Sequence, residues 1–190
     1  DFELAQGAFS RALEKDPDSA PVHFRQAELV AQSNDIAAAT RLAERGMVLD
    51  PDDIDGRLLT ARLYRLQRDL PGMQKALLNE QGEAISLEAA LLLYQVYLEN
   101  GRLDEALALA LQLEADDPGN LGAAMAVATT YERMGLLEEA EAALTRALEY
   151  HPDRFVLYAR LARMRRARGD REGEIELYEE VLEDYPDHYG

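Results

Sequence analysis

Apolar residues recur along the chain at the spacing of amphipathic helices. Ala140, Leu144 and Ala147 stand at i, i+4 and i+7, which places them on one face of a helix that would pack against a neighbour. A second helical segment precedes this one, and Gly135 lies between the two, where a left-handed helix cap favours glycine. The two helices are predicted over residues 121–134 and 137–150.

Prolines recur with a regular spacing. A proline has no backbone N–H to donate and disfavours a helical conformation in the residue before it, so each proline is expected to end a helix. Successive separations are 34, 67, 34 and 34 residues, so that one proline near residue 84 is missing from a period of 34. The prolines that keep this period are Pro17, Pro51, Pro118, Pro152 and Pro186, and a turn-forming aspartate follows at Asp18, Asp52, Asp153 and Asp187.

Other residue types keep the same period. One series runs through Ala27, Ala61, Tyr94, Ala128 and Ala162, and another through Ala5, Ala39, Met73, Ala106, Ala140 and Glu174. Turn positions are marked by Gly101, Gly135 and Gly169, with Asn34 and Arg68 in the equivalent places. One residue has been lost between about Glu80 and Leu87. A period of this length that contains two amphipathic segments predicts a repeat protein built from helix pairs.

Three stretches of the sequence resemble the tetratricopeptide repeat. They are Gly-Leu-Leu-Glu-Glu-Ala at 135–140 with Leu144, Ala147 and Pro152; Gly-Arg-Leu-Asp-Glu-Ala at 101–106 with Pro118; and Phe9, Ala12, Leu13 and Pro17. The resemblance implies a right-handed superhelix of helix pairs, in which the first helix of each pair lines a concave groove. We therefore expect an all-α, right-handed α-solenoid of antiparallel helix pairs with about 11 helices, a half repeat followed by five repeats.

The expected units form a single solenoid over residues 1–190, and two of them depart from the pattern. In the third unit Pro71 stands at the start of the second helix, Gly82 replaces the proline, and a polar loop covers 79–83. In the sixth unit Glu174 occupies a position that is usually small, so that looser packing is expected there. The units are 1–19 (partial), 20–53, 54–86 (degenerate), 87–120, 121–154 and 155–188.

Both ends of the sequence look like cuts within a longer array. The chain begins at a second helix, and Tyr189-Gly190 would begin another unit. Exposed apolar faces seek cover, so self-association through the end helices is expected. The apolar residues concerned are Phe2, Phe9 and Leu13 at one end and Ile175, Tyr178 and Val181 at the other.

Composition narrows the classes of function. The chain of 190 residues carries a net charge of −17 and contains no cysteine. Such an acidic chain is expected to be repelled by nucleic acid, and the absence of thiols excludes disulfides and cysteine-ligated zinc. Its apolar stretches are too short to insert into a membrane. The compartment, cytoplasmic or periplasmic, is left open because no targeting segment is visible.

No catalytic, cofactor or metal motif stands out, so an enzyme is not expected and no cofactor is predicted. His151-Pro152-Asp153 matches the tripeptide with which J-domains stimulate Hsp70 chaperones, but its position is that of the ordinary turn between repeats. The acidic run 50–56 suggests a calcium loop, but Pro51 and Arg62 would fall where carboxylates are needed. Turn and helix-cap roles explain both segments better.

If the family geometry holds, groove positions recur at i, i+4 and i+7 on the first helix of each pair. The candidates for binding a partner are Phe24, Leu58, Arg62, Arg65, Leu91, Gln95, Met125, Thr129, Arg163 and Arg166, with Glu28, Ala31, Leu98, Glu132 and Ala159 completing the stripes. Some family members hold the C-terminal carboxylate of Hsp70 or Hsp90 with a Lys and Asn clamp. Phe24 and Glu28 occupy the corresponding places here, so that function is not carried over.

Arginines gather in two stretches despite the negative net charge. The larger set is Arg154, Arg160, Arg163, Arg165, Arg166, Arg168 and Arg171, and the smaller is Arg57, Arg62, Arg65 and Arg68. Arginine pairs well with carboxylates and phosphates, which suggests a groove with basic ends for an acidic or amphipathic peptide. The alternative is pairing within the chain, for example with Glu172, Glu174 and Glu176.

The leading hypothesis is a non-catalytic scaffold that binds a protein or peptide through the groove, as part of a larger assembly protein. Two alternatives remain open at this point. The array could be a structural spacer between flanking domains, or the regulatory region of an enzyme whose catalytic domain lies elsewhere. Fold by itself does not decide among them, since function depends on the site.

Overall fold

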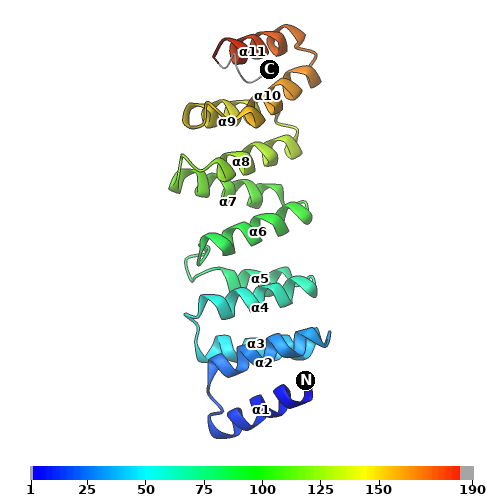
Figure 1. Cartoon of the computed structure of the whole chain (residues 1–190), viewed down its shortest axis with the longest axis vertical. Coiled ribbons are helices and arrows are strands. Elements are labelled where there is room, and N and C mark those ends of the chain that lie inside the picture. Colours follow the sequence, from blue (N-terminus) through cyan, green and yellow to red (C-terminus); the bar gives the residue numbers. More distant parts are fainter. Residues whose placement is uncertain (1, 185–190) are drawn as a thin grey trace. The chain divides into compact units, whose positions relative to one another are not determined.

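The computed structural model describes residues 2–184, which form eleven α-helices and one isolated β-bridge, Leu78–Ala84 (Figure 1). The prediction of an all-α fold with about 11 helices is thereby confirmed. The chain divides into two compact units, Asp1–Val96 and Tyr97–Gly190. The predicted markers Pro186 and Asp187, and the start of a further unit at 189–190, lie outside the described residues.

In the first unit each helix packs against the next, and α2 also contacts α4. The helices are α1 (Phe2–Lys15), α2 (Ala20–Gln32), α3 (Ile36–Leu49), α4 (Ile54–Leu66) and α5 (Leu70–Leu77). Helix α6 (Leu87–Glu99) runs across the boundary between the units.

The second unit repeats the arrangement, with contacts between successive helices from α7 to α11. The helices are α7 (Leu103–Asp116), α8 (Leu121–Met134), α9 (Leu137–Tyr150), α10 (Phe155–Ala167) and α11 (Arg171–Asp184). The two helices predicted over 121–134 and 137–150 are confirmed at both ends.

Short polar side chains set where several helices begin. The carboxylates of Asp35, Asp53 and Asp69 accept hydrogen bonds from backbone N–H groups three residues further on, at 2.9–3.0 Å. Asn120 caps α8 in the same way. These side chains satisfy donors that the first turn of a helix leaves unpaired.

The predicted turn positions share a left-handed backbone. Gly101, Gly135 and Gly169 have φ of 69°, 78° and 78°. Asn34 and Arg68, which the period placed at equivalent positions, have φ of 64° and 58°. The period therefore located the left-handed residue even where it is not glycine, because the same turn must join the two helices of each pair.

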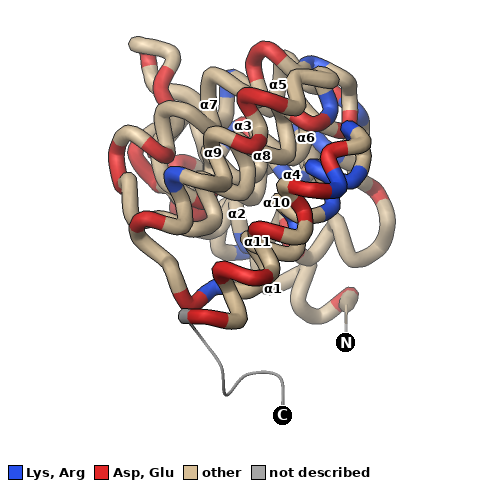
Figure 2. The backbone as a smooth tube through the Cα atoms, turned by 90° about the horizontal axis from the view of Figure 1, so that it is seen from above, with Lys and Arg blue, Asp and Glu red and all other residues tan. Residues whose placement is uncertain are grey.

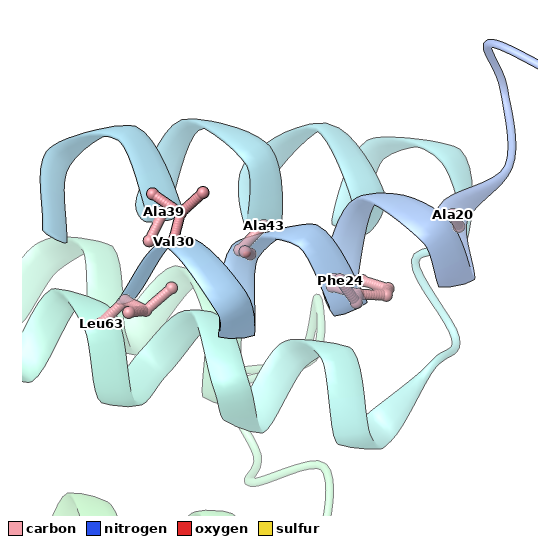
Figure 3. Packing of buried hydrophobic residues seen from close by; sticks show 7 residues of the cluster. Ala20, Phe24, Val30, Ala39, Ala43 and Leu63 are labelled. Atoms are coloured by element: carbon pink, nitrogen blue, oxygen red, sulfur yellow. The ribbon is translucent and has the colours of Figure 1, made fainter. Parts of the chain in front are cut away.

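Small residues let the helices of a pair approach closely. Ala27, Ala39 and Ala61 are completely buried in the first unit, as are Ala128 and Ala140 in the second. Figure 3 shows part of this packing, in which Ala20, Phe24 and Val30 of α2 lie with Ala39 and Ala43 of α3 and Leu63 of α4. Small side chains at these positions permit close-packed contact between neighbouring helices.

Helix α11 shows how the departures from the pattern are accommodated. Glu174, in the usually small position, is buried, but Arg166 pairs with it, so a charged partner offsets the cost of burial. Val181, expected to be uncovered, is 1% exposed, so that expectation is wrong for this residue. It lies on the same face of α11 as Leu177, which is also buried, whereas Ile175 and Tyr178 lie exposed.

Candidate functional site

The side chain of Arg160 on α10 contacts all three predicted groove residues of α8. Its guanidinium donates to Glu132 at 2.9 and 3.0 Å and to the Thr129 hydroxyl at 2.8 Å. It also lies 3.6 Å from the sulfur of Met125. The arginine side chain is only 12% exposed, so this part of the surface is closed by the chain itself. The sequence pattern places Arg160 in the basic cluster but does not by itself predict these contacts. The signal for them is the position of Arg160, one repeat and one residue after Met125.

Most of the other arginines in the larger set also bind acceptors within the chain. Arg165 donates to Glu141 at 2.9 Å and to the carbonyl of Gly173 at 2.7 Å, and Arg168 pairs with Glu141 as well. The alternative of internal pairing therefore holds for these residues. The chain has 37 acidic and 20 basic residues, and Figure 2 marks those in the described part of the chain in red and blue. The excess of carboxylates explains why arginines find partners nearby.

Arg166 and Arg163 of the same helix differ in whether they form an ion pair. Arg166 pairs with Glu174; this hydrogen bond lowers the pKa of the Glu174 carboxyl and raises the pKa of Arg166. Arg163 lies exposed and forms no ion pair with any residue that the structure describes. Of the two candidates on α10, only Arg163 combines an exposed side chain with the absence of an ion pair among the described residues.

The first unit contains a cavity of about 330 Å³ between α2 and α4. Four of the predicted stripe residues line it: Phe24, Glu28, Leu58 and Arg62. Phe24 and Leu58 are only 6% and 4% exposed, so they form its floor and belong to the core more than to the surface.

The ring of Phe24 packs closely against two glycines. A Cβ atom placed on Gly46 or Gly56 would lie 2.8 or 2.2 Å from it. At the rim, Glu28 pairs with Arg25 at 2.8 Å, and Arg62 pairs with Glu88.

The remaining candidates lie at different depths. Leu91, 44% exposed, and Gln95 face outward on α6, which suits a contact with a partner. Arg65 is half-buried on α4.

The two motifs that resembled functional loops have structural roles here. The Nε2–H of His151 donates to the carbonyl of Gly119 at 2.7 Å, which ties the turn of one repeat to the turn before it. Asp53, in the run that resembled a calcium loop, caps α4 by accepting from the Gly56 N–H at 2.9 Å. Residues 2–184 contain no group of His, Asp and Glu side chains arranged to hold a metal ion. Within the same range, no helix has the length and apolar composition needed to cross a membrane.

A family model described as tetratricopeptide repeat matches residues 1–63 and 97–164, and a second model of the same description matches 160–188. The chain belongs to the tetratricopeptide repeat family, and its fold is an all-α repeat solenoid. No curated protein matches the sequence.

Solved structures of similar fold include YrrB, described as a tetratricopeptide repeat protein with an unusual peptide-binding site. It has 17% sequence identity and a TM-score of 0.64, and the match covers 95% of this chain and 94% of that one. MamA matches with 15% identity, a TM-score of 0.65 and coverage of 88% and 92%. A MamA fragment from Desulfovibrio magneticus RS-1 matches with 16% identity, a TM-score of 0.63 and coverage of 91% and 98%. At these identities the likeness concerns the fold alone.

Proposed function

We propose that this chain is a non-catalytic scaffold that binds an acidic or amphipathic peptide segment of a protein partner along its first helices. The observation that carries the proposal is the state of Arg163: an exposed guanidinium on the groove stripe of α10, without an ion pair among the described residues. Arginine binds carboxylates through paired hydrogen bonds, so a partner's Asp or Glu is the expected contact.

Four further observations support a peptide ligand. The cavity lined by Phe24, Leu58 and Arg62 has room for one side chain, and Leu91 adds an exposed apolar contact. Proteins of this family are generally scaffolds without catalytic activity, and YrrB, of similar fold, is described as binding a peptide. A single array over residues 1–190, with the unit boundaries given above, is part of the same proposal.

The test is a selection of binding peptides from a random display library, followed by affinity measurements on the selected peptides. We expect the selected sequences to be rich in Asp and Glu. Arg163→Glu should weaken their binding about tenfold or more, because it replaces an attraction by a repulsion. The matched control is Arg41→Glu, which changes the net charge equally at an exposed position of α3.

Arg166 is left unchanged in this experiment because its loss would leave the buried Glu174 without its partner. Equal binding by the parent, Arg163→Glu and Arg41→Glu proteins would contradict the assignment of Arg163. A selection that yields no binding peptide would overturn the proposed function and favour a structural spacer.

A further inference from the structure

The second helix of the third repeat is cut short. Helix α5 has 8 residues, whereas α3, α7 and α9 each have 14. At 1.5 Å per residue, about 9 Å of helix is missing. A loop follows instead (Figure 1). In this loop Asn79 Oδ1 accepts hydrogen bonds from the N–H groups of Gln81 at 3.0 Å and Glu83 at 2.8 Å. The polar loop predicted over 79–83 is thereby confirmed.

A hollow of about 1110 Å³ lies beside the end of α5, and we call it the α3–α5 hollow. Its apolar walls are Met47 and Val48 of α3 and Leu78 at the end of α5, and the loop up to Gly82 forms another side. Val48 is 68% exposed, a large fraction for an aliphatic side chain in a helix. A helical segment about 9 Å long and 10–12 Å wide fills about 700–1000 Å³, which is close to the volume of the hollow.

The second unit shows how complete helices close this position. There Glu114, in the last turn of α7, and Arg146, one turn before the end of α9, form an ion pair at 3.1 Å, which joins the C-terminal parts of two consecutive second helices. Two repeats earlier, 67 residues back by the proline spacing, stand Met47 and Asn79. Both residues line the α3–α5 hollow. The hollow is therefore the place that the missing turns of α5 leave open.

Some polar groups around the hollow are already used within the chain. Arg57 donates to the carbonyls of Ala76 at 2.8 Å and Leu78 at 2.6 Å, so it holds the end of α5 in place. Glu44 accepts a hydrogen bond from Tyr64, whose pKa is raised by burial and by this bond.

Three charged side chains remain around the hollow: Asp52, Glu80 and Lys75. All three are exposed and form no ion pair within residues 2–184. Two of the three are carboxylates, and the whole chain is strongly acidic. A basic partner is therefore favoured.

From this geometry we infer that the α3–α5 hollow is a docking site for a short amphipathic helix of a protein partner. The helix takes the place of the absent turns of α5, its apolar face contacts Met47, Val48 and Leu78, and Lys or Arg side chains flank that face near Asp52 and Glu80. This surface lies on second helices, apart from the groove stripe, so the inference does not depend on the proposed function.

The probe for the test is a fluorescein-labelled 14-residue peptide with the sequence of α9, in which Glu138, Glu139 and Glu149 are replaced by Lys. It keeps the apolar stripe of a complete second helix and adds the basic flanks. Fluorescence anisotropy with the intact chain should show saturable binding, and a scrambled peptide of the same composition should bind at least about tenfold more weakly.

Val48→Lys is the decisive variant, because it places a charge on the exposed apolar wall without disturbing the core. We expect this substitution to lower the affinity for the probe about tenfold or more. Val156→Lys is the matched control, because Val156 is also an exposed valine, 53% exposed, but lies on α10 in the other unit. The Val156→Lys protein should bind the probe as tightly as the parent protein does. Circular dichroism of both variants checks that they are folded. The inference is wrong if the parent binds the scrambled peptide as well as the probe, or if Val48→Lys and Val156→Lys bind the probe equally.

Discussion

Single residues that break a general rule in this chain do so where the repeat demands it. Arg68 adopts φ of 58° because it must turn the chain between α4 and α5, the task that glycine performs at Gly135. A left-handed conformation costs an L-residue about 1–2 kcal/mol, so Arg68 keeps the turn at the expense of stability.

Arg68→Gly should therefore raise the free energy of unfolding by about 1 kcal/mol. Gly135→Arg is the reciprocal variant. A Cβ atom at Gly135 would meet nothing within 4 Å, so only backbone strain acts there. The free energy of unfolding of Gly135→Arg should therefore fall by a similar amount. Urea denaturation measures both. A loss of stability in Arg68→Gly would mean that the arginine side chain contributes more than its backbone costs.

At the scale of elements, glycines inside helices admit a large side chain from a neighbouring helix. Gly46 of α3 and Gly56 of α4 both lie against the Phe24 ring of α2. Glycine within a helix costs about 0.5–1 kcal/mol relative to alanine, and the burial of an aromatic ring at the junction of three helices offsets this.

Gly56→Ala should lower the free energy of unfolding by about 1–3 kcal/mol, because the new methyl group would overlap the ring and Gly46 leaves it no room to retreat. Gly7→Ala in α1 is the control: its Cβ would meet only the end of Arg11 at 3.5 Å, so the variant should gain about 0.5–1 kcal/mol. Thermal and urea denaturation report both changes. Equal stability of Gly56→Ala and the parent would show that Phe24 is not confined as described.

At the scale of the whole molecule, apolar side chains remain exposed on its terminal described helices. On α11, Ile175, Tyr178 and Leu182 recur at i, i+3 and i+7 and are each at least 38% exposed. On α1, Leu4 is 71% exposed. Contiguous apolar surface of this kind favours association.

We expect the average mass measured by light scattering after size exclusion to rise above the 21.2 kDa of one chain as concentration increases. Ile175→Lys combined with Leu182→Lys should restore the mass of a monomer, since two charges would have to be buried in the contact. The control Leu66→Lys, at an exposed leucine at the end of α4, should not restore the mass of a monomer. Concentration-independent mass in the parent protein would contradict the prediction of self-association.

The helices, their order and their turns follow from the sequence by itself, because they depend on local patterns: a 34-residue period, one apolar face per helix, capping aspartates and a left-handed turn residue. Even Asn34 and Arg68 were placed by their position in the period. The right-handed sense of the superhelix and the boundaries of the units stay predictions.

Only the tertiary structure decided which candidates are accessible and which charges are paired. Arg160 forms an ion pair with Glu132, which precedes it by 28 residues, and Arg165 forms one with Glu141, which precedes it by 24 residues. These pairs therefore depend on how neighbouring helices pack. The sequence therefore placed Arg163 and Arg166 on the groove stripe but could not show that Arg166 is paired with Glu174. The burial of Phe24 and the opening of the α3–α5 hollow have the same origin, since both depend on which surfaces face each other once the helices have packed.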